Sequence, residues 1–192
     1  SFYFASMAVR SERKVPSSLL CALSVLPGIQ LVIEISRGVI AYPYPVHDLR
    51  LIGILICSML FSQCLVTIVA NQFAPHWAGR LKFASVIIIA TAVSWAAGMD
   101  GKASVALLVA SVLSLGIVIY GYTRAMPNAG SYAWALALFS ALNLSAQGMF
   151  LNVYFFYVIA ALLSFLMVQQ AAAYAREVQL KKLARTRADQ LE

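Results

Sequence analysis

Charged residues are scarce in this chain of 192 residues. They make up 11% of it, whereas apolar residues make up 62%. A soluble domain is roughly half apolar and a quarter charged, so the composition excludes an ordinary soluble domain. It predicts an integral membrane protein whose partner is the lipid bilayer. With spans of about 20 residues and short loops, six or seven crossings fit the chain length.

Residues that carry out chemistry are also few. The three cysteines, Cys21, Cys57 and Cys64, lie inside apolar stretches and lack the spacing of zinc ligands. The two histidines, His47 and His76, are expected in loops on opposite sides, where they cannot share a haem or a metal ion. No nucleophile motif, HExxH zinc site or phosphate-binding loop occurs. We therefore expect no enzymatic activity, catalytic residue, metal ligand or cofactor in this segment.

The net charge of +7 raises the alternative of nucleic acid binding. However, the basic residues flank the apolar stretches, as the positive-inside rule requires of cytoplasmic loops, and we expect no nucleic acid partner. Eleven fall on one predicted side and three on the other. This split predicts a multi-pass protein of the bacterial inner membrane with a cytoplasmic C-terminus. The eleven are Arg10, Arg13, Lys14, Arg80, Lys82, Arg124, Arg176, Lys181, Lys182, Arg185 and Arg187; the three are Arg37, Arg50 and Lys102.

The apolar stretches predict an all-α fold, a polytopic membrane helix bundle over residues 1–170 followed by a cytoplasmic linker helix over 171–192. Residues 1–9 are either a truncated span, which makes seven spans, or an interfacial helix, which makes six. The loop over 37–48, with its alternating prolines and tyrosines, is expected to follow a stiff extended path. The expected spans are 1–9 (partial), 15–36, 49–70, 81–98, 103–123, 131–150 and 151–169.

The stretch from Leu151 to Glu192 contains no glycine or proline. As one helix it would be roughly 60 Å long, about twice the thickness of the hydrocarbon core, so half of it must project into water. In the projecting half, Leu180, Ala184 and Leu191 follow the spacing of one side of a short coiled coil, although Arg187 interrupts the seam. We expect a homodimer joined along this helix.

The expected span over 131–150 carries two patterns. Small residues recur at every fourth position, which is the spacing that lets helices approach closely in lipid. Ser140, Asn143 and Gln147 form a polar stripe beside them, and Leu138, Leu142, Phe139 and Phe150 are expected to face lipid. Internal packing with a few hydrogen bonds between helices, a dimer interface and a ligand-lined cavity all remain open. The small residues are Ala133, Ala137, Ala141 and Ser145.

Glu34 is the only acidic residue inside an expected span. Because a charge in the membrane is costly, we expect it to reach the outer interface or to pair with Arg37. Gln30 lies one turn away, so the two side chains could form an outward-facing ligand pocket. If the protein is a transporter, Gln30, Glu34, Asn143 and Gln147 would line its path.

Three segments together resemble the seven-transmembrane region of bacterial receptors with diverse intracellular signalling modules. They are the basic segment AVRSERK after the first expected span, the outer loop and span YPYPVHDLRLIGIL, and the exit helix AAAYAREVQLKKLARTRADQLE. In that family, the last span leads into a histidine kinase, a diguanylate cyclase or a similar output. The resemblance implies a sensor and transducer with an output domain beyond Glu192, and it assigns no binding residue. The alternatives are a transporter or channel subunit and a structural subunit of a larger membrane complex.

Overall fold

The computed structural model describes residues 14–39, 44–146 and 154–189, and every element in these ranges is helical. The expected partial span over 1–9, Gln147, Phe150 and Leu191 lie outside the described residues. The elements are α2 (Lys14–Val39), α3 (Tyr44–Phe73), the 3₁₀ turn η1 (Pro75–Trp77), α4 (Ala78–Trp95), α5 (Met99–Thr123), α6 (Ala129–Ala146) and α7 (Phe155–Asp189).

Within the described ranges, four helices are long and apolar enough to cross a membrane. They cover Ser18–Ser36, Val46–Phe73, Pro75–Trp95 and Met99–Thr123. The first apolar part of α7, Phe155–Gln169, is shorter, and α6 is not among the four. The all-α class is thus confirmed for the described residues, and the four apolar helices support a membrane protein. The count of six or seven spans stays a prediction.

Two loop predictions need correction. The extended path predicted for 37–48 is wrong at both ends, because α2 continues to Val39 and α3 already begins at Tyr44; residues 40–43 lie outside the described residues. Pro45 is compatible with this start, since the first turn of a helix leaves its N–H groups unbonded. The connection expected over 99–102, between the spans 81–98 and 103–123, lies earlier, at Ala96–Gly98, and Met99 opens α5. Asp100 then lies in the first turn of α5, where the helix dipole favours a negative charge.

Two turns between helices require special backbone conformations. Gly98 has φ 70° and ψ 154°, a combination that is essentially restricted to glycine. After α5, the N–H of Ala125 donates to the Tyr122 carbonyl and the N–H of Met126 donates to the Gly121 carbonyl. This pair of bonds is a Schellman motif, and it requires a left-handed residue, here Ala125 with φ 52°.

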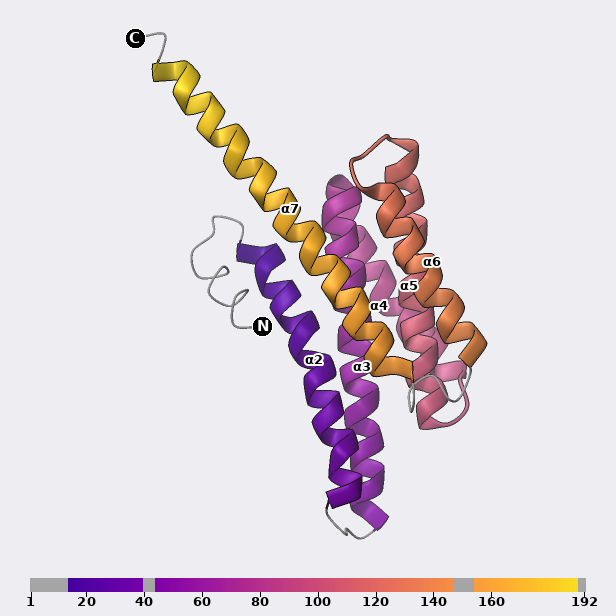
Figure 1. Cartoon of the computed structure of the whole chain (residues 1–192). Coiled ribbons are helices and arrows are strands. Elements are labelled where there is room, and N and C mark those ends of the chain that lie inside the picture. Colours follow the sequence, from indigo (N-terminus) through magenta and orange to yellow (C-terminus); the bar gives the residue numbers. More distant parts are fainter. Residues whose placement is uncertain (1–13, 40–43, 147–153, 190–192) are drawn as a thin grey trace.

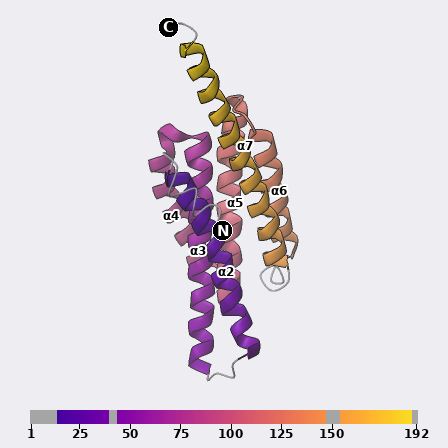
Figure 2. The ribbon, with the colours of Figure 1, turned by 60° about the vertical axis from the view of Figure 1, so that its left-hand side comes forward.

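The helices form an antiparallel bundle in which α5 packs against α3, α4 and α6, while α2 lies on the outer side of α3 (Figure 1). The lower part of the α2–α3 hairpin extends beyond the other helices (Figure 2). The main core joins α2, α3, α5, α6 and α7, and a smaller cluster joins α3, α4 and α5. Many large apolar side chains on the outside are exposed, as expected for a surface that contacts lipid.

One end of the bundle collects most of the basic residues in the described helices. The start of α2, the η1 turn, the α5–α6 turn and the projecting half of α7 all lie at this end (Figure 1). In contrast, Arg50 lies in the second turn of α3 and Lys102 in the first turn of α5, at the opposite end. The arrangement of the helices is therefore compatible with the predicted division of charge between the two sides.

Candidate functional site: the exit helix and its contacts

The last helix, α7, runs without a break over 35 residues. At 1.5 Å per residue its length is about 52 Å, well beyond the roughly 30 Å of the hydrocarbon core. Figure 1 shows it crossing the bundle at a slant and extending past the other helices. The expected single rod from the apolar stretch into the charged tail is thus present over Phe155–Asp189.

A narrow stripe attaches α7 to the bundle. Phe155, Ile159, Leu162 and Leu166 are buried, and their spacing of four, three and four places them on one helix face. The opposite face is open, since Tyr157 is 79% exposed. The stripe packs mainly against α2 and α6. The helix is therefore held along one side only.

A row of aromatic rings connects α7 to the interior. The Phe73 ring of α3 meets the Tyr132 ring of α6 edge-on at 5.2 Å, and Tyr132 meets the Phe165 ring of α7 at 5.4 Å. Such pairs are worth about 0.5–1.5 kcal/mol beyond the area they bury. Behind Phe73 lies Gly121 of α5, where a Cβ atom would come within 2.7 Å of the Phe73 ring. The absence of a side chain at Gly121 therefore permits the position of Phe73 and of the row.

An ion pair joins α2 to α3 at the other end of the bundle. The Arg50 Nη1 donates to Glu34 Oε2 at 2.9 Å; the Arg50 side chain is 7% exposed and that of Glu34 31%. Arg50 Nε is buried without an acceptor among the described residues. Gln30, one turn from Glu34 on α2, is also buried. The sequence analysis missed Arg50 as the partner, because only the α2–α3 hairpin brings the two together.

The length of α3 indicates how deep this ion pair lies in the membrane. Arg50 precedes Phe73 by 23 residues, which is about 35 Å along a helix and close to the thickness of the hydrocarbon core. The pair and the aromatic row therefore lie near opposite boundaries. Glu34 is thus expected at an interface, where a charge is far less costly than at the centre of the bilayer.

Polar side chains of α6 form hydrogen bonds with residues of α5. Ser104 Oγ donates to Asn143 Oδ1 at 2.7 Å, and Asn143 Nδ2 donates to the Ser104 carbonyl at 3.2 Å. One turn before Asn143 on α6, Ser140 Oγ donates to Ser111 Oγ of α5 at 2.8 Å. The interpretation of this stripe as internal packing with hydrogen bonds between helices is supported by these contacts.

The structure does not bring the described members of the candidate ligand pocket together. Gln30 and Glu34 lie on α2, which packs on α3 and α7, whereas Asn143 is bonded to α5. Gln147 lies outside the described residues. The polar groups are therefore divided between two separate helix contacts.

The small-residue stripe of α6 is not its buried face. Ala133 and Ala137 are half-buried, and Ala141 and Ser145 are exposed. The buried face instead carries Tyr132, Leu136, Phe139 and Asn143. Phe139, expected to face lipid, is only 2% exposed, which corrects that prediction, whereas Leu138 and Leu142 are exposed as expected.

Comparisons with protein-family models, with curated proteins and with solved structures found no match to this chain.

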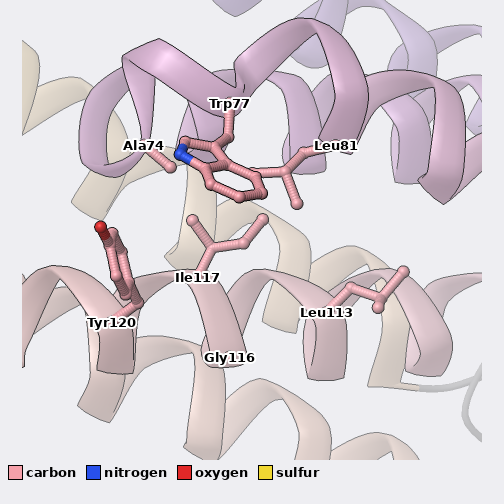
Figure 3. Close-up of a pocket in the computed structure, with 7 residues that line it drawn as sticks. All are labelled: Ala74, Trp77, Leu81, Leu113, Gly116, Ile117 and Tyr120. Atoms are coloured by element: carbon pink, nitrogen blue, oxygen red, sulfur yellow. The ribbon is translucent and has the colours of Figure 1, made fainter.

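An apolar groove was not foreseen from the sequence. It has a volume of about 380 Å³ and lies between the η1–α4 segment and α5. Figure 3 shows the Trp77 indole above Ile117, with Tyr120 upright at one end and Leu113 at the other. Its residues are separated by about 40 positions in the chain, so no local pattern could indicate it.

The predicted coiled-coil positions lie in the projecting half. Leu180 and Ala184 belong to α7, and Leu191 lies outside the described residues. Dimerisation along this helix stays a prediction.

Proposed function

We propose that this chain is the membrane sensor and transducer module of a bacterial signalling receptor. A stimulus changes the packing of the bundle, and α7 passes the change to a cytoplasmic output of the histidine kinase or diguanylate cyclase type. The observation that supports this function is the unbroken α7, which is attached along one narrow stripe and extends beyond the other helices. A continuous helix transmits rotation or translation over its length, whereas a broken one absorbs it.

The attachment of α7 suits a movable element. Lipid is as apolar as the side chains of the stripe, so sliding or rotating α7 exchanges protein contacts for lipid contacts of similar polarity. Two packings of such a helix can therefore differ by only a few kcal/mol, as a switch requires. We expect the α3–α5–α6 group to stay fixed, because α5 packs more extensively against α3 and α6 than α7 packs against the bundle, and α5 is also hydrogen-bonded to α6.

The outer end of α2 is the best candidate for the input. Glu34 and Arg50 form the ion pair there, and α2 also packs against α7. A stimulus that separates the pair would release α2 from α3 and change the surface on which α7 rests. The pair is thus proposed as an element of coupling rather than as a lining of a transport path.

The test uses a chain carrying a reporter output domain after Glu192. One to four alanines are inserted after Gln170, each of which rotates everything downstream by about 100°. We expect the output to rise and fall with the helical period and to return near its starting value after three or four insertions. Four glycines inserted at the same place serve as a control of equal length that uncouples the helix. Equal output from all four alanine variants would refute transmission through α7.

A second experiment tests the homodimer and the topology. Cys21, Cys57 and Cys64 are replaced by alanine, and single cysteines are then placed along residues 179–188 of the tail. A paired helix gives disulfide crosslinks with a period of about 3.5 residues in membranes. Uniformly absent crosslinks would exclude the paired helix, and a membrane-impermeant thiol reagent that labels the tail in intact cells would exclude a cytoplasmic C-terminus.

A further inference from the structure

The apolar groove has the properties of a binding site for one acyl chain. Its lining consists of Ala74, Trp77 and Leu81 on one side and of Leu113, Ile117 and Tyr120 on the other. Gly116 forms part of the α5 wall, and an added Cβ there would meet nothing within 4 Å. The volume of about 380 Å³ falls in the range of small-molecule sites. From Leu113 to Tyr120 the groove follows α5 for about 10 Å, a third of the hydrocarbon core.

Two arginines lie next to the aromatic rings that line this groove. The Arg80 Cζ lies 5.7 Å from the centre of the Trp77 ring, and the Arg124 Cζ lies 5.5 Å from the centre of the Tyr120 ring. Both arginines are exposed. One comes from the α4 wall and the other from the end of α5, so the two walls each contribute one cation.

The position of these groups matches a lipid in the bilayer. Trp77 and Tyr120 are the aromatic residues expected at a membrane–water boundary. The groove continues from them toward the apolar middle of α5, while the guanidinium groups remain exposed beside the rings. Arginine binds phosphate oxygens in a planar, two-pronged geometry. A neutral apolar ligand would use the groove but would gain nothing from the two cations.

We propose that the groove binds one anionic phospholipid, with an acyl chain between Trp77 and Ile117 and the phosphate between Arg80 and Arg124. The proposal is independent of the signalling function, because it needs only the bilayer and the groove. A membrane lipid is the expected occupant, since the groove is apolar and its two aromatic residues, Trp77 and Tyr120, are exposed near the expected membrane boundary.

The test measures fluorescence quenching of Trp77 by lipids with brominated acyl chains. Trp95 and Trp134 are replaced by phenylalanine in the full chain, which is reconstituted in phosphatidylcholine vesicles. Brominated phosphatidylglycerol or brominated phosphatidylcholine is then added as a small fraction of the lipid. We expect Trp77 to be quenched at a several-fold lower fraction of phosphatidylglycerol than of phosphatidylcholine.

A matched control comes from Trp134, which lies in the first turns of α6 at the same end of the bundle and is 80% exposed. A chain with Trp134 as its only tryptophan senses the surrounding lipid, so both brominated lipids should quench it equally. Equal quenching of Trp77 by the two lipids as well would mean surrounding lipid only and would overturn the proposal.

Variants distinguish the contribution of the groove to the lipid preference from the contribution of the two arginine charges. Arg80→Gln and Arg124→Gln should each reduce the preference for phosphatidylglycerol about fivefold, whereas Lys102→Gln at the opposite end should not change it. Gly116→Leu fills the groove and should abolish the preference, while Gly28→Leu, at another exposed glycine with free space, should leave it intact. A preference that survives Gly116→Leu, or one unaffected by both arginine changes, would refute the site. The count of lipids retained in native mass spectrometry gives a second readout that is independent of the Trp77 environment.

Discussion

Gly121 determines how closely α3 and α5 approach at the end of the bundle where α7 leaves. A Cβ atom added there would lie 2.7 Å from Phe73 Cδ1 and 3.1 Å from both Cβ and Cγ of Phe73. Rotation of the ring about its Cβ–Cγ bond relieves the first contact but not the other two, because Cβ and Cγ lie on the rotation axis. Gly121→Ala therefore requires α3 and α5 to separate.

The size of the effect is set by two opposing terms. Overpacking of this kind costs about 1–3 kcal/mol. Replacing a glycine by alanine inside a helix contributes up to about 1 kcal/mol in the other direction. Gly116→Ala is the matched control, since it lies inside the same helix and its new Cβ meets nothing within 4 Å. The difference between the two variants, about 1–3 kcal/mol, isolates the steric cost.

The assay is unfolding of the purified chain by sodium dodecyl sulfate in mixed micelles, followed by circular dichroism. Gly121→Ala should unfold at lower detergent fraction than the parent, and Gly116→Ala at an equal or higher fraction. Combining Gly121→Ala with Phe73→Leu should be less harmful than the sum of the single changes, with a coupling of about 0.5–3 kcal/mol. Equal midpoints for the two glycine variants, or strict additivity with Phe73→Leu, would refute the steric argument.

Three further predictions use the same unfolding assay. Glu34→Gln should destabilise the bundle more than Arg50→Gln, by about 1–3 kcal/mol against less than 1, because it leaves the more deeply buried charge without a partner; the reverse order would contradict the burial. Ala125→Gly should stabilise by about 0.5–1 kcal/mol by relieving the left-handed conformation, and a lower midpoint would argue against that strain. Asn143→Ala should cost about 0.6–1.7 kcal/mol, and Ser104→Ala should add little more once Asn143 is absent; two fully additive losses would mean that the two side chains do not act together.

The membrane character and the helical class followed from the sequence because they depend on composition and on the length of apolar stretches. A bilayer accepts a spanning segment when its backbone is bonded internally and its side chains are apolar. Both conditions are local, so the helices over residues 14–39, 78–95 and 99–123 lie close to the expected spans. The continuity of α7 was likewise readable, because nothing between Phe155 and Asp189 interrupts a helix.

The contacts between helices could not be read in the same way, because each depends on which faces meet. Small residues every fourth position favoured one face of α6, but its aromatic side chains filled the space against α3 and α5 and turned that face outward. Glu34 obtained its partner from α3 rather than from its own helix because the hairpin aligns residues 16 positions apart. The groove needed η1 and α5 together. Composition and periodicity therefore determined what each segment is, and packing decided which side chains meet, since burial and pairing are properties of surfaces that come from distant parts of the chain.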